Sequence, residues 1–449
     1  FVDFLHPHID KYWYQLISQF HSVLPFDGLW VDMNEPSNFV DGSVNGCTNN
    51  SLDKPPFVPP GIDGGSLYAS TACPSALQDL SSHYNLHNLY GWSEIRATAQ
   101  ALVRLLGKRS LVITRSSFPG AGASGGHWTG DNLSNFSDIY FSIPGILNFN
   151  LFGIPLVGAD ICGFRGNTTR ELCIRWMQAG SFYPFMRNHA EGYSVPQDPG
   201  VFDKEAQDIM RSALETRYSL LPYLYTQFYY SHTTGAPVIR PLFFDYPGTE
   251  AVDRQFLWGR EILVSPVLEE GADSVSAYIP HGTWYDLHEL TVLNVPGGTV
   301  QNLDAPLSKI NAHVRGGSIL PMLPPAVTTT LSRQGKMELL VAPDVSQGQA
   351  TATGRLFWDD GESLGAIDLG LYTEVHFTLF KTHLQSDVLS KGYGPVVLGK
   401  VRVLGVGSSP LNVTLNGQTA PFLYNISSKV LTIQPLSWDL QVPFTLVWN

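Results

Sequence analysis

Short apolar runs alternate with amphipathic segments over the first 235 residues of the chain. The segments between and after these runs carry residues at helical spacing, for example Ile95, Thr98 and Leu102, and this pattern stops at Gly107. A second helical pattern runs from Met210 through Leu221 to Tyr225, before Gly235. The alternation predicts a parallel sheet of βα units. Its expected strands are GLWVDM (28–33), SLVITR (110–115), GHWTGD (126–131), LVGAD (156–160) and, more weakly, YPFMRN (183–188).

The pattern changes after about residue 240. Segments such as YTEVHFTLF, KVRVLGV, LNVTLNG, KVLTIQPL and PFTLVWN are short, rich in β-branched residues and separated by Gly, Pro, Ser and Asn. Such segments are typical of antiparallel β-sandwiches. We therefore predict an α/β region at 1–239, with an insertion at about 36–90, followed by a proximal β-sandwich at 240–322 and a distal one at 323–449. The Pro-rich SILPMLPPAV marks the second division.

The number of predicted βα units limits what this chain can form alone. Five units are recognisable, whereas a closed (β/α)₈ barrel needs eight units and about 250 residues. If the fold is this barrel, about three units come from another chain or from an earlier part of a precursor.

Composition and charge exclude several classes of partner. The chain has 449 residues, of which 43% are hydrophobic and 15% charged, so it can bury a large core. The chain contains no run of 18 apolar residues, so its sequence predicts no membrane-spanning helix. The formal net charge of −12 disfavours binding to nucleic acid or to an anionic membrane surface.

The cysteines and glycosylation sequons point to the secretory route. Four cysteines fall into two close pairs, Cys47 with Cys73 and Cys162 with Cys173, and neither pair has metal-site spacing, so two local disulfides are favoured. The sequon at Asn132 lies directly beside a candidate active-site acid, Asp131, and we do not expect a glycan there. The candidate glycosylation sites are Asn49, Asn167, Asn412 and Asn425.

The chain opens FVDFLHPHIDKYWY, which has neither a basic n-region nor an apolar h-region. We expect a signal peptide, if the protein has one, to lie outside this chain.

Three motifs match functional patterns by spacing alone. GAGASG (120–125) fits a dinucleotide fingerprint and GASGG (122–126) fits a nucleophile elbow, but both patterns require a helix directly after the glycines, and no helical pattern follows. His83 and His87 have the spacing of metal ligands on a helix, yet no third ligand follows at a suitable distance. We interpret these as loop glycines and as core or loop histidines.

Three aspartates end predicted apolar strands. They are Asp32, Asp131 and Asp160, and the aromatic residues Trp30, Trp128 and Phe164 lie near them in sequence. Barrel enzymes place their chemistry at the carboxyl ends of the strands. Aromatic faces stack on sugar rings, and carboxylates bind hydroxyls and serve as acid or nucleophile. The alternative is that each Asp caps the helix that follows it.

Five segments, GLWVDMNEPSNF, ITRSSFPGAG, GHWTGD, LVGADICGF and FYPFMRNH, resemble in order and spacing the α-glucosidases of glycoside hydrolase family 31. The form DMNEPSNF is most similar to the lysosomal acid branch of that family. The resemblance extends over essentially the whole chain, including both cysteine pairs, HYNLHNLYG (83–91), GTWYDL (282–287) and LFWDDGES (356–363).

The resemblance implies roles for individual residues. It makes Asp32 the nucleophile, Asp131 the general acid/base and Glu35 a residue that orients or electrostatically supports Asp32. Leu133 stands where the family often has Trp, so an aromatic contact at or beyond the +1 subsite is expected to be lost. For Arg115 a salt bridge at the strand ends is an alternative or an additional role. The implied substrate-binding residues are Arg115, His189, Asp160, Trp30, Met33, Trp128 and Phe164.

The implied activity is exo-acting hydrolysis, with retention, of terminal α-1,4-linked glucose from maltose, malto-oligosaccharides and glycogen. The resemblance implies no metal and no organic cofactor. An α-xylosidase or transglucosylase of the same family, and a catalytically silent sugar-binding homologue, remain as alternatives. The expected partner is an N-terminal chain of the same precursor, supplying the missing strands and an N-terminal β domain. The expected location is the lysosomal lumen, with secretion as the alternative.

Overall fold

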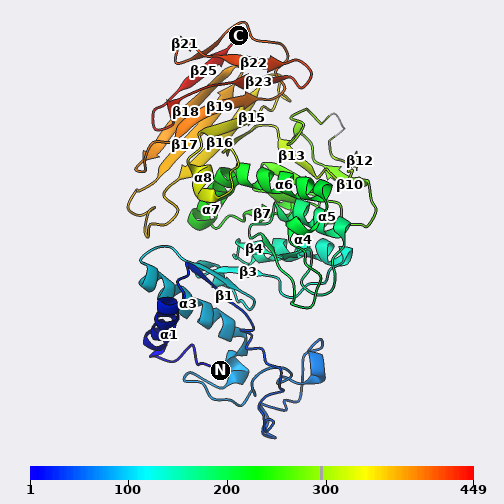
Figure 1. The fold of residues 1–449 in the computed structure, drawn as a ribbon, viewed down its shortest axis with the longest axis vertical. Helices are drawn as coiled ribbons and strands as arrows, with labels where there is room; N and C mark the ends of the chain where they lie inside the picture. Colours follow the sequence, from blue (N-terminus) through cyan, green and yellow to red (C-terminus); the bar gives the residue numbers. More distant parts are fainter. Residues whose placement is uncertain (294–296) are drawn as a thin grey trace. The chain divides into compact units, whose positions relative to one another are not determined.

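The computed structural model describes residues 1–293 and 297–449, which form two compact units (Figure 1). Unit 1 comprises Phe1–Gly130, Leu151–Val157 and Glu362–Leu364. Unit 2 comprises Asp131–Asn150, Gly158–Gly361 and Gly365–Asn449.

Unit 1 contains a parallel sheet flanked by helices. β1 pairs in parallel with β2, and β2 with β3, in the strand order β1-β2-β3-β4. The bounds are α1 (Ile9–Val23), β1 (Gly28–Val31), η1 (Asp63–Gly65), α2 (His83–Leu86), η2 (His87–Leu89), α3 (Tyr90–Leu106), β2 (Leu111–Thr114), η3 (Ala121–Ala123), β3 (Gly126–Trp128) and β4 (Val157–Gly158).

The longest helix of unit 1, α3, follows its predicted pattern. Ile95 and Leu102 are fully buried on one face, and the helix ends at Gly107, which adopts the left-handed conformation with φ 65°. The glycine segment after β2 leads through the short η3 into β3 rather than into a long helix, which agrees with its interpretation as a loop.

The insertion between β1 and α3 has little regular structure, and a disulfide and a buried carboxylate hold it together. Cys47 and Cys73 form the expected disulfide. Asp53, only 2% exposed, accepts hydrogen bonds from the Ser75 backbone N–H at 2.8 Å and from the Thr48 hydroxyl at 2.7 Å. These bonds join two segments of the insertion that lie more than 20 residues apart in sequence.

Unit 2 begins with further βα elements. β5 and β6 pair in parallel. The bounds are α4 (Phe136–Leu151), β5 (Asp160–Ile161), α5 (Arg170–Gly180), β6 (Arg187–Asn188), η4 (Pro199–Val201), α6 (Lys204–Ser219) and α7 (Leu221–Thr234).

Two predicted elements are divided in the structure. The apolar run 156–160 forms two short strands, β4 and β5. The helical pattern from Met210 to Tyr225 is split between α6 and α7, because Pro222 cannot continue a helix and instead occupies the first turn of α7.

The rest of unit 2 is almost entirely β-structure. One sheet has the order β11-β13-β9-β8-β7, a separate ribbon joins β10 and β12, and a twelve-stranded sheet contains the remaining strands. The bounds are β7 (Ile239–Arg240), η5 (Leu242–Phe244), β8 (Phe256–Trp258), β9 (Ile262–Ser265), β10 (Ser274–Ile279), β11 (Trp284–Asp286), β12 (Thr299–Asp304), β13 (Asn311–Arg315), β14 (Ser318–Met322), α8 (Thr329–Arg333), β15 (Met337–Ala342), β16 (Thr351–Trp358), β17 (Thr373–Phe380), β18 (His383–Lys391), β19 (Val397–Val403), β20 (Val413–Leu415), β21 (Gln418–Thr419), β22 (Phe422–Asn425), β23 (Val430–Ile433), β24 (Trp438–Asp439) and β25 (Thr445–Trp448).

The twelve-stranded sheet has its own hydrophobic core. Alternate residues of β17, including Val375, Phe377 and Leu379, are buried in it, as the period of two along a strand requires. The chain is thus a partial (β/α)₈ barrel followed by a mostly β region, which confirms the predicted fold class. The predicted domain boundaries at 239/240 and 322/323 stay predictions. No helix among the described residues has the length and hydrophobicity needed to cross a membrane.

Arg175 joins the helical part of unit 2 to its β region. This α5 side chain is 2% exposed, and its guanidinium donates to the carbonyls of Ala272 at 2.9 Å, Ala305 at 2.8 Å and Pro306 at 3.1 Å. Burial lowers the pKa of Arg175. Carbonyl acceptors around a buried guanidinium offset part of its desolvation cost.

We therefore expect Arg175→Met to lower the free energy of unfolding by about 3 kcal/mol, because the substitution leaves several buried carbonyls without a donor. Urea denaturation of the complete protein measures this. Arg211→Met on the exposed face of α6 is the matched control and should change stability by less than about 0.5 kcal/mol. Equal effects of the two substitutions would show that Arg175 does not join the two regions.

Candidate active site

Asp32 lies directly after β1, at the carboxyl end of a parallel strand. Its carboxylate accepts a hydrogen bond from the Met33 backbone N–H at 2.7 Å, and its side chain is 35% exposed. Met33 has a left-handed backbone conformation, with φ 55°. The chain thus turns sharply after the strand and leaves the Asp32 carboxylate partly open to solvent.

Arg115 contacts two carboxylates on the loop that follows β1. It lies just after the neighbouring strand β2. Its Nε and Nη2 donate to the two oxygens of Glu35 at 2.8 and 2.9 Å, and its Nη1 lies 3.3 Å from an Asp32 oxygen. The arginine side chain is 20% exposed, so these charges are only partly screened by water. A fork-shaped guanidinium between two carboxylates fixes their separation.

A buried amide fixes the loops that carry these charges. Asn34, 2% exposed, donates to the Thr114 hydroxyl at 2.7 Å and accepts from the Ser116 backbone N–H at 2.9 Å. Gly91 of α3 packs so closely here that an added Cβ would lie 2.8 Å from the Asn34 carbonyl. The loop after β1 is therefore tied both to the loop after β2 and to the helix behind it.

Two tryptophans at the strands pack against each other. The ring centroids of Trp30 and Trp128 are 5.3 Å apart in an edge-to-face arrangement. Trp128 is 1% exposed, whereas Trp30 is 47% exposed. In unit 1 the structure therefore brings together six of the predicted residues, which are Trp30, Asp32, Met33, Glu35, Arg115 and Trp128.

A cavity of about 910 Å³ lies on the Glu35 side of this group. Charged and ring side chains on its wall include Glu35, Arg115, His83 and His87, and the apolar part of the wall includes Phe57 from the insertion. The insertion thus contributes directly to the surroundings of the candidate carboxylates.

Asp131 belongs to unit 2 and lies beside an arginine. An Arg165 nitrogen is 3.0 Å from an Asp131 oxygen, and the two side chains are 57% and 28% exposed. Leu133, at the position where the resemblance would have Trp, is 49% exposed. Asn132 between them donates to the Asp160 carbonyl at 2.9 Å and accepts from the Phe164 N–H at 2.9 Å. Because its amide is used in these contacts, Asn132 is poorly suited to carry a glycan.

Asp160, at the start of β5, is 1% exposed and is held by Arg187 of β6. The Nε and Nη2 atoms of Arg187 donate to one Asp160 oxygen at 2.9 and 2.6 Å. A carboxylate this deeply buried requires such a cation and its hydrogen bonds.

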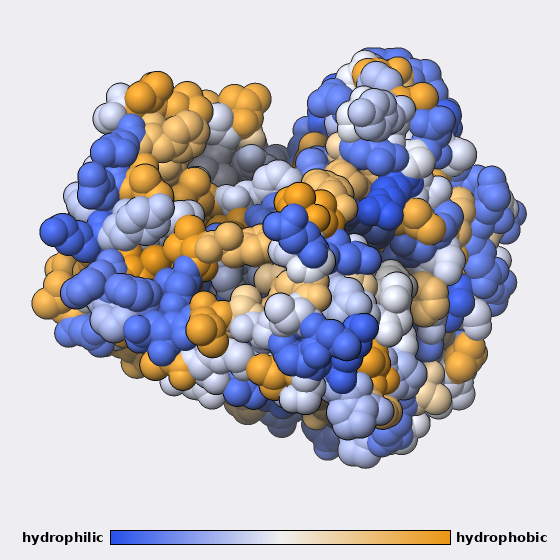
Figure 2. Space-filling view, turned by 90° about the horizontal axis from the view of Figure 1, so that it is seen from below, coloured by the Kyte–Doolittle hydropathy of each residue, from blue (hydrophilic) through white to orange (hydrophobic). Residues whose placement is uncertain are grey.

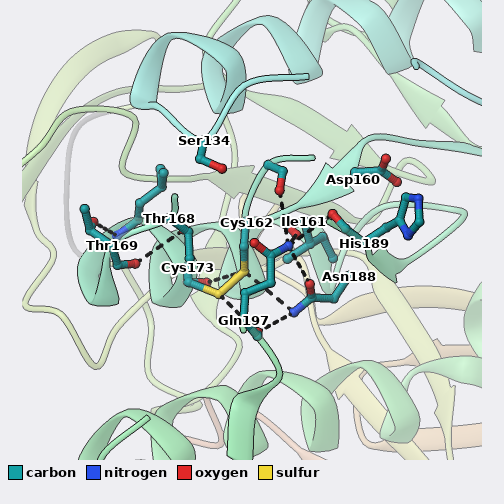
Figure 3. Close-up of a disulfide and its surroundings, with 12 residues drawn as sticks. Ser134, Asp160, Ile161, Cys162, Thr168, Thr169, Cys173, Asn188, His189 and Gln197 are labelled. Carbon is teal, nitrogen blue, oxygen red and sulfur yellow. Dashed lines mark hydrogen bonds between the residues drawn. A yellow bond between two sulfur atoms is a disulfide. The ribbon is translucent and has the colours of Figure 1, made fainter. Parts of the chain in front are cut away.

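His189 and Phe164 stack on one another, with ring centroids 5.1 Å apart and planes 26° from parallel. Figure 3 shows Asp160 and His189 on the side of this loop cluster away from the Cys162–Cys173 disulfide, which is the second predicted bridge. The structure thus places the four predicted residues of unit 2, Asp131, Asp160, Phe164 and His189, on segments that contact one another.

Gln197 fixes these loops and was not predicted. It is 5% exposed, and its Nε2 lies within hydrogen-bond distance of the carbonyls of Ile161 at 3.2 Å, Gly163 at 3.2 Å and His189 at 3.1 Å (Figure 3). The partner arginines Arg165 and Arg187 were also missed. Arg187 lies within the recognised segment FYPFMRNH, so proximity to a motif was an available signal. Gln197 offered no sequence signal.

Within the described ranges, no three His, Cys, Asp or Glu side chains are arranged to hold a metal ion.

Comparisons with known proteins place the chain among sugar hydrolases. The description "Glycosyl hydrolases family 31 TIM-barrel domain" matches residues 1–227, and "Glycosyl hydrolase family 31 C-terminal domain" matches residues 235–320. Lysosomal alpha-glucosidase of Rattus norvegicus is 47% identical over 472 aligned positions, covering 100% of this chain and 49% of that protein. Intestinal sucrase-isomaltase of Homo sapiens is 42% identical, covering 100% of this chain and 26% of that protein.

A crystal structure of glucosidase II alpha subunit superposes with a TM-score of 0.88 at 29% identity, covering 100% of this chain and 49% of that one. The chain spans about half the length of the lysosomal relatives that it matches. The two domain models of the family together match most of the chain, and the rat lysosomal alpha-glucosidase is 47% identical over the whole length of the chain. This chain therefore belongs to glycoside hydrolase family 31.

Proposed function

We propose that the complete protein containing this chain is a retaining exo-α-glucosidase that removes terminal α-1,4-linked glucose from maltose, malto-oligosaccharides and glycogen. The observation that carries the proposal is the placement of Arg115 against both Asp32 and Glu35 at the carboxyl end of a parallel strand, in a chain of this family. An ionised, partly exposed carboxylate at that place has the properties of a nucleophile.

The proposed reaction proceeds by double displacement. A retaining glycosidase needs two carboxyl groups about 5 to 5.5 Å apart, one ionised and one protonated. Asp32 attacks the anomeric carbon while Asp131 donates its proton to the leaving oxygen. Asp131 then acts as the base that activates water, which releases glucose from Asp32. Glu35 orients Asp32 through the arginine that they share.

The remaining predicted residues would bind the terminal glucose. Arg115, His189 and Asp160 offer donors and acceptors for hydroxyl groups. Trp30, Met33 and Phe164 offer apolar and aromatic surface, against which the face of a sugar ring packs well. Trp128, which is 1% exposed, packs against Trp30 and holds that ring in place.

Two other functions are compatible with family membership. An α-xylosidase or transglucosylase would differ in how its pocket treats a hydroxymethyl group or an acceptor sugar. A silent sugar-binding homologue would be expected to lack a carboxylate, and both Asp32 and Asp131 are present.

We propose the lysosomal lumen as the site of action, with secretion as the alternative. The names of the 47%-identical relatives and the two disulfides support this location. The candidate glycosylation sites Asn49, Asn167, Asn412 and Asn425 are all exposed, as an attached glycan requires.

The proposed partner is the preceding part of the same precursor, with the missing barrel strands. β1 is the last strand of its sheet and, among the described strands, pairs with β2 on one side. In the same unit, α1 exposes large apolar side chains, including Leu16 at 38% and Phe20 at 55%. Figure 2 shows hydrophobic residues gathered in patches on one face of the molecule. An open sheet edge with exposed apolar surface favours further βα units there.

The roles proposed for Asp32 and Asp131 can be distinguished with two substrates, maltose and α-glucosyl fluoride. We expect Asp32→Asn in the full-length protein to reduce kcat on maltose by about 10⁴-fold or more, because no nucleophile remains. Asp131→Ala should reduce kcat on maltose similarly but affect the first turnover of α-glucosyl fluoride far less, since fluoride leaves without a proton. For the wild-type protein acting on maltose, proton NMR of the glucose that is released first should show the α anomer.

The matched control is Asp208→Asn on the exposed surface of α6, which should leave the activity unchanged. A folded wild-type protein that turns over neither substrate would contradict the glucosidase proposal. Hydrolysis of an α-xyloside in preference to maltose would support the first alternative instead.

The proposed partner predicts a specific loss of association. We expect Phe20→Asp to weaken binding between this chain and the separately produced preceding segment by about 10-fold or more, because it places a charge on apolar surface that the partner buries. Leu411→Asp, at a residue 93% exposed in unit 2, is the control and should bind normally. Calorimetric titration measures both, and equal affinities would show that α1 does not contact the partner.

A further inference from the structure

Two histidines outside the proposed catalytic set form a hydrogen-bonded relay on the wall of the unit 1 cavity. His83 Nε2 and His87 Nδ1 are 2.9 Å apart, and His83 Nδ1 is 3.2 Å from Gln78 Oε1. The Gln78 amide nitrogen donates at 3.4 Å to Asp3 near the start of the chain. The relay therefore runs from Asp3 to the cavity.

The chemistry of each group fixes the direction of the relay. The Asp3 carboxylate accepts from the Gln78 amide nitrogen, so the Gln78 oxygen is directed at His83 and can only accept. His83 must then carry its proton on Nδ1, which leaves Nε2 as the acceptor for the Nδ1–H of His87. His83 cannot bind a second proton without breaking its bond to His87. The ring nitrogen of the relay that can take up a proton is thus His87 Nε2.

His87 is held close to the loop that carries Glu35. It begins η2, which runs directly into α3, and Gly91 of α3 packs against the Asn34 carbonyl, one residue before Glu35. His87 and Glu35 line the same cavity. Burial lowers the pKa of His87, and the Glu35 charge raises it in opposition.

Three buried titratable groups on the elements around His87 are neutral between about pH 4 and pH 7. Burial, and then His87 itself, lowers the pKa of His83 to about 4, and burial lowers that of His127 on β3 to about 4, so both are neutral above that pH. Burial raises the pKa of Glu94 on α3 to about 7, so this carboxyl is neutral in acid. The groups that line the cavity with His87 are His83, Tyr84, Asp41, Glu35 and Arg115.

We propose that His87 is a positioning residue that binds a proton on Nε2 in acid and then supplies a second cation beside Glu35. Glu35 accepts hydrogen bonds from two of the three guanidinium nitrogens of Arg115, and the third nitrogen lies beside Asp32. A cation at His87 attracts the Glu35 carboxylate, which lines the same cavity. Arg115 consequently stays shared between Glu35 and Asp32 in acid.

This inference rests on the proposed function, and the experiment uses His87→Asn in the full-length protein. The Asn amide can replace Nδ1–H as the donor to His83 but has no counterpart of Nε2. We expect kcat/KM on maltose to fall about threefold at pH 4 and to change little at pH 7, so that the acid limb of the profile moves to higher pH. His8→Asn, at an exposed histidine of unit 1, should leave the profile unchanged. An equal loss at both pH values would overturn the proposal.

A second measurement does not depend on activity. Nitrogen-15 NMR of histidine-labelled protein should show the Nδ1–H tautomer for both His83 and His87, and Glu35→Gln should move the His87 titration to lower pH. An Nε2–H tautomer of His87, or a titration unaffected by Glu35→Gln, would overturn the proposal. These results hold whether or not maltose is hydrolysed, so failure of the relay can be distinguished from failure of the glucosidase assignment.

Discussion

The need to neutralise carboxylates at the ends of parallel strands governs the structure around the candidate site. Acids placed at or near the carboxyl ends of parallel strands lose part of their hydration to the loops around them. In each case a guanidinium from a neighbouring loop or strand compensates. The pairs are Arg115 with Asp32 and Glu35, Arg165 with Asp131, and Arg187 with Asp160.

Buried amides complete this arrangement by fixing the loops. Asn34 in unit 1 and Gln197 in unit 2 are each at most 5% exposed and hydrogen-bond to backbone groups of neighbouring loops. If charged side chains alone held such a loop, each binding event would include the full entropic cost of ordering the loop. The amides order the loops beforehand, so the charged groups keep their positions when no ligand is bound.

Local sequence patterns predicted which helices and strands are present better than they predicted where each one begins and ends. The helical spacing of Ile95 and Leu102 and the stop at Gly107 gave α3 correctly, because burial of one face and the left-handed end are local properties. The break between α6 and α7 was missed even though Pro222 marked it. Asp32 was recognisable as a polar residue that follows an apolar run, and it lies directly after β1. Asp160 was predicted to end a strand, whereas it begins β5.

The sequence by itself determined the fold class, the family, the two disulfides and the candidate acids, because each depends on residue type and spacing along the chain. Only the tertiary structure decided which side chains hold those acids. Asp131 and Arg165 are 34 residues apart, and Asp160 and Arg187 are 27 apart. The relay from Asp3 through Gln78 to His83 likewise joins distant segments. Such contacts depend on the path of loops through space, which no periodicity encodes, whereas helices and strands repeat at fixed intervals.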